Sequence, residues 1–423
     1  MTDRIRLLGA ASELLLFLLL LHILYTNDFT TLGFFGFGPF YTIGAQRRLF
    51  VLLFLVFLIH AAVPERYRKH VLLAGGLLGG TVTYPELMPG LLALTGFVYL
   101  VVHHVGRRVT VKLACLLGLF LGLGWWSAHS PYGQLLSLVF VALTFFRTLL
   151  YLHAMATRGY PATPFSDFLR FQLPIASFAI HPYLGVIPPF ATRGRARPLD
   201  VLVEEGRRLL RGGLAALLAA RVVARFGTLI FSGETGGGGV PTDLLGWHGW
   251  TMVHMVVALL DTSACAAFLV GLMLMLGWDL KPAMNRPWFS EGLFEYWNRF
   301  IIHFKDFQVT LFFYPTVLAL RRVPRNVAVV VGVAMTFLVG NNLVHILGRY
   351  LYTAERETLL PRGVRANLAL TCVMALAFLW EEYKQARRRD GRPLPFGLGS
   401  SKWPVRVVRI YLTLAVVSWV WFL

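Results

Sequence analysis

Charged side chains are scarce in this sequence. Only 14% of its 423 residues are Asp, Glu, Lys or Arg, whereas 57% are hydrophobic and the mean hydropathy is +0.63. Soluble domains carry about 25% charged residues. Uncharged apolar runs recur along the chain at lengths that suit a bilayer. The composition therefore excludes a soluble globular protein and predicts a polytopic integral membrane protein built of helices.

Cysteines and acidic residues are also few. Cys115, Cys265 and Cys372 lie far apart inside apolar runs, which excludes a disulfide framework and a CxxC metal site. The 21 acidic residues face 40 basic ones, and the net charge is +19. The basic residues lie in short segments between apolar runs, as in cytoplasmic loops, and form no stripe interleaved with aromatic residues. We therefore expect membrane lipids as partners, no nucleic acid, and no bound cofactor or metal.

The predicted fold is all-α, a transmembrane helical bundle of about ten spans with additional re-entrant and interfacial helices. Residues 1–423 are expected to form one membrane domain. Its parts are N-terminal helices (1–157), a proline-rich re-entrant and amphipathic region (158–240), a core with polar motifs (241–350) and C-terminal helices (351–423). Arg4 and Arg6 precede the first apolar run, Leu7 to Tyr25, which favours a retained helix and a cytoplasmic N-terminus.

Several apolar runs are too long or too irregular for one ordinary span. The run from Val71 to Val105 is expected to break at Tyr84-Pro85 and at Pro89-Gly90, which gives a helical hairpin, or one short and one full span. One helix is expected from Leu135 to Ala156. Its Arg147 and His153 are expected to bond to neighbouring helices for structure, and the alternative is a role in a functional site. From Trp247 to Trp278, two spans and one long tilted helix are both compatible with the length.

Between Tyr160 and Phe190, six prolines exclude a straight span although the segment stays apolar. Two arrangements are open. One is a re-entrant segment that lines a cavity, with His181 as its polar group, and the other is an interfacial loop on the membrane. From Leu199 to Phe226, arginines alternate with Leu and Ala at helical spacing, which predicts an interfacial or partly spanning helix.

Polar residues that are costly in lipid concentrate between Leu260 and His345. Asp261 stands near the start of this stretch. Glu295, Arg299 and His303 are spaced four apart, so we expect them on one face of a helix. Such spacing would bring a carboxylate, a guanidinium and an imidazole together.

A second polar group lies in the apolar run MTFLVGNNLVH. Asn341 and Asn342 precede His345 by four and three residues, which places them on one helical face. A neutral histidine in an apolar tunnel can take the proton of a hydroxyl that attacks an acyl carbonyl, while amides orient the reactants and the oxyanion. His345 is therefore the candidate general base. The alternative is a histidine that only hydrogen-bonds between helices.

The order and spacing of these residues resemble those of the membrane-bound O-acyltransferase (MBOAT) family. The resemblance extends over Gly246 to Tyr350 and is closest to the bacterial branch with the teichoic acid D-alanine transferase and the alginate O-acetylation protein. Three elements carry it, the last with one extra residue before the histidine. The first is Asp261, Gly271, Gly277 and Asn285-Arg286-Pro287, which resembles the family's run that leads to Asn-Arg-Pro. The second is Glu295 to Phe300, which resembles Phe-Trp-x-Arg-Trp. The third is Thr336 to His345, which resembles Thr-Phe-Leu-x-x-Gly-Leu-Trp-His.

The resemblance implies that residues 241–350 are the catalytic core of an O-acyltransferase with His345 as the base. Asn298 and His303 are implied as further catalytic residues. Other expected tunnel or support residues are Asn341, Asn342, Asp261, Arg286, Trp297, Glu295, Arg299 and His181. From the residues alone, Asp261 and Arg286 are expected as ion-paired supports of helix packing, and Trp297 as an interface or packing aromatic.

The sequence also departs from the family pattern. Ile301 stands where many members have a histidine or asparagine, and His303 follows two residues later. Asp261 is followed by Thr-Ser-Ala-Cys where the family prefers a tyrosine, and His181-Pro182 replaces Gly-Pro. These departures are compatible with an altered substrate or with lost activity.

The function implied by the resemblance is acyl transfer from an acyl-CoA or acyl carrier thioester to a hydroxyl of a glycan, a cell-envelope polymer or a lipid. The implied location is the bacterial cytoplasmic membrane, with envelope-modification proteins as partners. Basic loops such as that of Arg321, Arg322 and Arg325 would suit an acidic carrier or the phosphates of coenzyme A. The alternatives are a membrane transporter or channel, and an inactive MBOAT-like scaffold.

Overall fold

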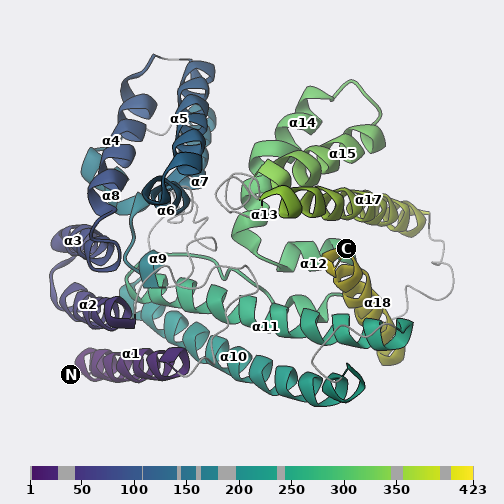
Figure 1. The fold of residues 1–423 in the computed structure, drawn as a ribbon, viewed down its shortest axis with the longest axis horizontal. Coiled ribbons are helices and arrows are strands. Elements are labelled where there is room, and N and C mark those ends of the chain that lie inside the picture. Colours follow the sequence, from purple (N-terminus) through teal and green to yellow (C-terminus); the bar gives the residue numbers. More distant parts are fainter. Residues whose placement is uncertain are drawn as a thin grey trace. The chain divides into compact units, whose positions relative to one another are not determined.

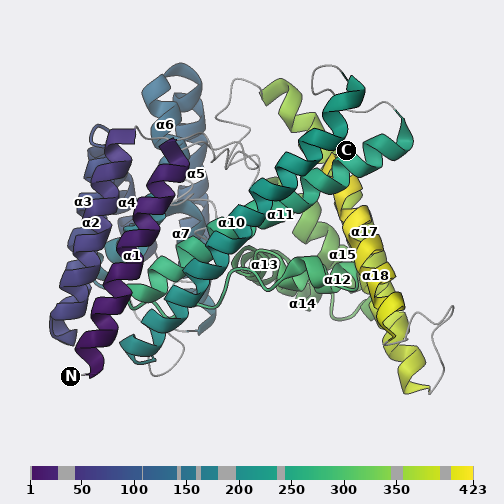
Figure 2. The same ribbon diagram turned by 90° about the horizontal axis from the view of Figure 1, so that it is seen from below.

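The computed structural model is all-helical, as the sequence predicted. It describes residues 2–26, 43–106, 108–140, 144–158, 163–179, 197–235, 243–343, 356–390 and 402–422. Of these residues 87% are helical, and they include no strand. The helices are drawn in Figures 1 and 2.

Four helical segments in this part of the chain are long and apolar enough to cross a membrane. They are Val109–Ser127, Leu244–Met275, Val364–Arg389 and Trp403–Val420. Three shorter apolar helices are Gly9–Leu20, Met88–His104 and Arg325–Asn341. The protein is thus suited to membrane association, and the number of about ten spans stays a prediction.

The chain divides into two compact units. Unit 1 comprises Met1–Ala215 and Ala264–Pro282, and unit 2 comprises Ala216–Ser263 and Ala283–Leu423. The long helices α10 (Leu199–Thr235) and α11 (Leu244–Met275) contribute residues to both units. The predicted division into four consecutive segments remains a prediction.

Unit 1 contains the N-terminal helices. In unit 1, α2 packs on α1 and α3, while α4, α5 and α6 form a second packed group (Figure 1). The other helices of this unit are short or shared with unit 2. The bounds are α1 Thr2–Thr26, α2 Ile43–Ala62, α3 Glu65–Thr83, α4 Met88–His104, α5 Val109–His129, α6 Pro131–Phe140, α7 Phe146–Arg158, α8 Phe165–Gln172 and α9 Ala176–Ala179.

Prolines set several helix boundaries in unit 1. The chain turns between α3 and α4 at Tyr84-Pro85, so the predicted interruption there is confirmed. The interruption predicted at Pro89-Gly90 is wrong, because both residues lie in the first turn of α4, where proline is tolerated. Pro64 caps α3, and Pro131 opens α6. Proline lacks a backbone donor and fixes φ, and it is therefore tolerated at a helix start and disruptive inside a helix.

Three other stretches of the sequence have the following helix bounds. Arg66 and Lys69 lie in the first turns of α3, because Pro64 caps the helix directly before them. The expected helix from Leu135 to Ala156 is described as α6 and α7, on either side of residues 141–143. Trp247 to Trp278 gives the single helix α11, which ends before Gly277, where φ is 83°. Glycine is the common residue for such a left-handed helix end.

The described part of the proline-rich region lies inside unit 1. Phe168 of α8 and Ala176 of α9 are fully or almost fully buried, and both helices pack on α3. Arg147 of α7 is buried and donates to the Gln172 carbonyl at 2.6 Å and to the Ser177 hydroxyl at 2.8 Å. Arg147 is therefore bonded to neighbouring helices, one of the two roles expected for it, and residues 168–178 of this region are largely buried. His181 lies outside the described residues.

Unit 2 contains the C-terminal helices and several short, irregular ones. Figure 1 shows α15 lying along α17, and Figure 2 shows α17 beside α18. The bounds are η4 Pro287–Phe289, α12 Leu293–Arg299, α13 Ile302–Gln308, η5 Val309–Phe313, α14 Tyr314–Ala319, α15 Arg325–Ala334, η6 Met335–Asn341, α17 Arg356–Arg389 and α18 Trp403–Phe422. Pro324 caps α15, and η5 and η6 are π-helical turns.

Two glycines allow α10 and α11 to approach closely within unit 1. A Cβ atom added to Gly206 would lie 2.6 Å from the Gly271 carbonyl oxygen and 2.7 Å from Met275 Cγ. A Cβ atom at Gly271 would lie 2.8 Å from Leu210 Cδ2. Small residues at such crossings let helix backbones pack directly, which is a common device in membrane bundles.

We predict opposite effects for two alanine substitutions on α10. Gly206→Ala should destabilise the protein by about 1–3 kcal/mol, because the methyl group overlaps the backbone of α11. Gly212→Ala should stabilise it by up to about 1 kcal/mol, because no atom lies within 4 Å of the added methyl and alanine favours the helix. Denaturant unfolding in detergent measures both. Equal effects of the two changes would contradict the close crossing.

Candidate functional site

The predicted site residues that the structure describes all belong to unit 2. His345 and His181 lie outside the described residues. Asp261 is on α11, Arg286 precedes η4, and the other seven lie on α12, α13, η6 or directly after η6. Three contacts connect the sequence motifs within this unit.

The first contact is a pair of backbone hydrogen bonds. The Asn285 N–H donates to the Arg299 carbonyl at 2.9 Å, and the Ile302 N–H donates to the Ala283 carbonyl at 2.7 Å. The Asn285-Arg286-Pro287 motif is thereby fixed against the end of α12 and the start of α13. Two sequence motifs that are separated along the chain form one local structure.

The backbone of this local structure is strained. Arg286 has φ 47° and Ile301 has φ 36°, and these are the non-glycine residues with positive φ in the described part of the chain. A left-handed backbone costs about 1–3 kcal/mol at such residues, and it is a clear outlier for β-branched isoleucine. Strain of this kind gathers at functional sites when surrounding structure maintains it. Arg286 directly follows Asn285, and Ile301 lies between Arg299 and Ile302, so both strained residues are next to the residues that form these hydrogen bonds.

The break at Ile301 corrects the expectation of one helical face. Glu295 and Arg299 of α12 do form an i,i+4 ion pair, with Arg299 Nη2 2.5 Å from Glu295 Oε1. His303 belongs to α13 instead, because Phe300 is extended and Ile301 is left-handed between the two helices. His303 is buried, at 3% exposure.

The second contact joins α12 to η6 through aromatic packing. Trp297 and Phe337 meet edge to face, with ring centroids 4.5 Å apart. Both are buried in one cluster with Val333 and Met374. Trp297 is therefore a packing aromatic, one of the two roles expected for it, and it connects the Glu295 to Phe300 motif to the Thr336 to His345 motif.

The third contact is a buried cluster of amide side chains, which we call the amide cluster: Gln308, Asn341, Asn342 and Asn367. Asn341 donates to Asn367 Oδ1 and Asn367 donates to Asn342 Oδ1, each at 2.5 Å. Gln308 donates to Asn341 Oδ1 at 3.2 Å. The predicted pair Asn341 and Asn342 is thus bridged by a residue of α17 and extended by a residue of α13.

The amide cluster is flanked by both π-helical turns. Gln308 directly precedes η5, and Asn341 is the last residue of η6. A Cβ atom at Gly340 would lie 2.7 Å from the Phe312 ring, so this glycine lets η5 and η6 approach. Single π turns inside helices occur frequently at functional sites. Here they change the helical register next to the buried amides.

Gln308 retains an open hydrogen-bonding position. Its side chain is fully buried, and its Oε1 atom has no hydrogen-bond partner among the residues that the structure describes. His303 lies five residues earlier on the same helix, which packs against η6. A buried amide oxygen without a partner costs about 1–3 kcal/mol and can accept a hydrogen bond from a bound hydroxyl or amide.

Asn298 forms no hydrogen bond with the amide cluster in the described part of the chain. Its side chain is exposed, and Lys305 Nζ lies 3.4 Å from its Oδ1 atom. The neighbouring Tyr296 phenol is buried in the core of unit 2 and has no hydrogen-bond partner within the described part of the chain, and burial raises its pKa above the ordinary value. The structure therefore supplies no hydrogen bond that would bring Asn298 to Asn341 or Asn342.

Asp261 forms a buried ion pair between helices. Arg221 Nη2 of α10 donates to Asp261 Oδ1 at 2.9 Å, and the carboxylate side chain is 6% exposed. Asp261 therefore has the ion pair expected of a support of helix packing, and its partner is Arg221. Arg286 is exposed on a separate segment.

Four notable polar residues were not among the predicted site residues: Gln308, Asn367, Arg221 and Tyr296. Gln308 and Asn367 each interrupt an apolar stretch, in FQVTLFF and ANLALTC. That interruption is the signal that could have identified them, since an amide in an apolar helix needs a buried partner. The pairing itself depends on the packing of α13, η6 and α17.

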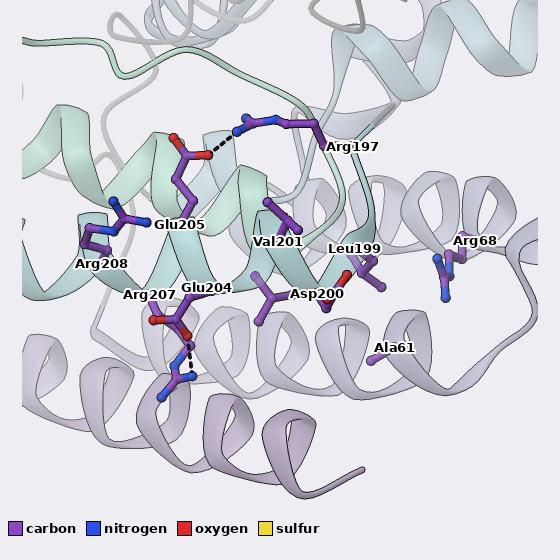
Figure 3. A pocket seen from close by; sticks show the side chains of 11 residues that line it. Ala61, Arg68, Arg197, Leu199, Asp200, Val201, Glu204, Glu205, Arg207 and Arg208 are labelled. Carbon is purple, nitrogen blue, oxygen red and sulfur yellow. Dashed lines mark hydrogen bonds and ion pairs between the residues drawn. The ribbon is translucent and has the colours of Figure 1, made fainter. Parts of the chain in front are cut away.

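A separate cavity of about 910 Å³ lies in unit 1 (Figure 3). Arg197 at its edge contacts Asp279 at 2.6 Å and Glu205 at 2.5 Å. Arg207 contacts Glu204 at 2.7 Å and also pairs with Glu13. Arg197 and Arg207 are thus neutralised by carboxylates, and the lining is of mixed charge. None of the predicted site residues lines this cavity.

Comparison with protein families and with curated proteins identifies no relative of this chain. No protein-family model matches the sequence, and no curated protein matches it.

We predict that Asn367 stabilises the amide cluster. Asn367→Ala removes the bridge between Asn341 and Asn342 and should cost about 1–3 kcal/mol, because two buried amides lose their partner. Asn326→Ala is the matched control on an exposed helix position and should change stability by no more than about 0.5 kcal/mol. Thermal unfolding in detergent measures both. A cost no larger than that of the control would contradict the bridging role.

We also predict strong coupling between Arg221 and Asp261. Arg221→Met should destabilise the protein by about 3–5 kcal/mol, because it leaves a buried carboxylate unpaired. The double variant Arg221→Met with Asp261→Leu should regain most of that loss, because no buried charge remains. Denaturant unfolding of the two single variants and the double variant measures the coupling. Additive losses would show that the two side chains act independently.

Proposed function

We propose that this protein is a membrane O-acyltransferase. It moves an acyl group from an acyl-CoA or acyl carrier thioester to a hydroxyl of a glycan, a cell-envelope polymer or a lipid, and His345 is the general base. The implied setting is the bacterial cytoplasmic membrane with a cytoplasmic N-terminus. The proposal extends the resemblance to the MBOAT family, and the geometry of unit 2 supports it.

The observation that carries the proposal is the amide cluster. Asn341 and Asn342 belong to the motif that ends at His345, and both are buried and held by Asn367. Buried amides in an apolar protein are costly unless they are bonded, so a fixed group of four indicates a demand for oriented polar atoms. Acyl transfer has that demand, since it needs an oriented hydroxyl and donors for an oxyanion.

In the proposed reaction, His345 takes the proton of the acceptor hydroxyl. The hydroxyl oxygen attacks the thioester carbonyl, and an amide N–H group stabilises the oxyanion that forms. The carbon–sulfur bond then breaks, and the proton passes from His345 to the leaving thiolate. The products are an ester and a free thiol. His303, buried on α13, is a second polar group for the tunnel.

Helix packing supports this assignment at the level of the motifs. Backbone hydrogen bonds join the Asn285-Arg286-Pro287 motif to the break between α12 and α13, and Trp297 packs on Phe337. Within unit 2, the Asn285-Arg286-Pro287 motif, the Glu295 to Phe300 motif and the described part of the Thr336 to His345 motif are therefore connected by direct contacts. Residues of these motifs that are far apart in the sequence are neighbours in unit 2.

A second candidate function is transport. The buried pair of Arg221 and Asp261 lies where α10 meets the candidate span α11, and ionisable pairs inside membranes often mark ion or proton pathways. A transporter would move solute across a vesicle membrane with no acyl donor present. The inactive scaffold is the remaining alternative.

We predict that acyl transfer depends on His345. The purified protein in nanodiscs is supplied with labelled acyl-CoA of several chain lengths, with carrier-linked donors, and with membrane extract as the acceptor mixture. His345→Ala should reduce transfer by about 10²–10⁴-fold, the usual contribution of a general base. Scintillation counting of the acceptor fraction measures the label.

The matched control is His254→Ala. His254 is exposed, and its ring packs on Trp250 of the same helix with centroids 3.9 Å apart. This variant should transfer label as the wild type does. If folded wild-type protein moved no label from any donor, the acyltransferase proposal would be wrong, and solute flux in proteoliposomes would decide between transport and a scaffold.

A further inference from the structure

Two segments of unit 2 bring basic side chains to one end of the unit. The turn between α14 and α15 carries Arg321, Arg322 and Arg325, and α17 ends with Arg387, Arg388 and Arg389. Arg325 Nη2 lies 3.0 Å from Glu382 Oε1, so the turn is joined to the last two turns of α17. Figure 1 shows the α14–α15 turn at the same end as the C-terminal end of α17. We call this surface the arginine end.

The arginine end has an excess of positive charge that its own carboxylates do not balance. Glu382 is engaged with Arg325, and Glu381 with Lys384 at 2.5 Å. Arg321, Arg322, Arg388 and Arg389 are exposed and form no ion pair with the described residues. The surface is therefore suited to an anionic partner.

Aromatic side chains on α17 indicate the depth of this surface in a membrane. Leu376, in the candidate span, is 66% exposed, as expected for a side chain in contact with lipid tails. Trp380 and Tyr383 follow, both exposed and stacked with centroids 5.4 Å apart, and Arg387 lies 5.9 Å over the Tyr383 ring. Trp and Tyr are enriched at the membrane–water boundary.

Helix geometry then places the free arginines at the depth of the headgroups. Arg388 follows Tyr383 by five residues, which is about 7.5 Å along the helix axis. The polar headgroup layer on each side of a bilayer is about 5–8 Å thick. A guanidinium at that depth can form two parallel hydrogen bonds to a phosphate.

We propose that the arginine end binds the phosphate headgroups of anionic phospholipids. The order of exposed leucine, stacked aromatics and arginine along α17 fits a lipid, because a lipid offers acyl chain, boundary and phosphate at the same three depths. A soluble acidic protein or a free phosphate-bearing donor would contact the arginines alone. It would leave the exposed leucine and the aromatic side chains of α17 without an apolar partner. Arg325, one of three arginines expected to bind such a donor, is engaged by Glu382. This inference does not depend on acyl transfer.

The test compares phosphatidylglycerol with phosphatidylcholine. The full protein in neutral detergent receives either lipid, and native mass spectrometry counts the lipids retained while thermal unfolding reports the stability gained. Phosphatidylglycerol should bind the wild type more tightly, and the preference should shrink at high salt. In the variant R321Q/R322Q/R388Q/R389Q, binding should weaken about fivefold for each arginine removed.

A matched control removes four exposed basic residues elsewhere: R66Q/K69Q/R108Q/R225Q. It changes the net charge equally and should keep most of the preference for phosphatidylglycerol. Equal losses in both variants would show a general charge effect and overturn the proposal. It would also be overturned if the arginine variant kept its lipid preference and instead lost binding of coenzyme A or of an acidic carrier protein.

Discussion

A polar side chain inside an apolar bundle needs a hydrogen-bond or ionic partner, and unit 2 is organised around this constraint. Asn341, Asn342 and Asn367 satisfy one another, and Arg221 pairs with Asp261. The alternative in each case is a buried group without a partner, at a cost of several kcal/mol for a charge. Helices that supply such partners are held in one relative position, because a rotation or slide would separate them.

The same region departs most from regular helical structure. Two π-helical turns and two left-handed residues, Arg286 and Ile301, lie between Asn285 and Asn342, in the region proposed as the acyltransferase core. A regular helix from Glu295 to Gln308 would avoid the backbone strain. The irregular path instead places Trp297 on Phe337 and Gln308 beside Asn341. The strain is maintained because the aromatic and amide contacts depend on it.

Unit 1 shows a different use of polar groups. Arg147 is surrounded by a carbonyl and a hydroxyl from α8 and α9, so it holds short helices that the prolines prevent from forming one span. The cavity of that unit is lined by arginines and carboxylates in mixed pairs. The arginine end of unit 2 has the opposite character, since its free cations outnumber its carboxylates. The charge of each surface depends on where carboxylates lie near the arginines. The net charge of +19 does not determine those positions.

The sequence by itself determined the all-α class, the interruption at Pro85 and the burial of Asn341 and Asn342, because hydropathy, proline and polar residues act locally. It did not determine that Arg221 is the partner of Asp261 or that Asn367 bridges the two asparagines, because those pairs join residues 25 to 40 positions apart. It also predicted one helical face for Glu295 and His303, whereas the packing of Phe300 and Ile301 separates them. Periodicity assumes a continuous helix, and only tertiary contacts decide where a helix breaks against its own preference.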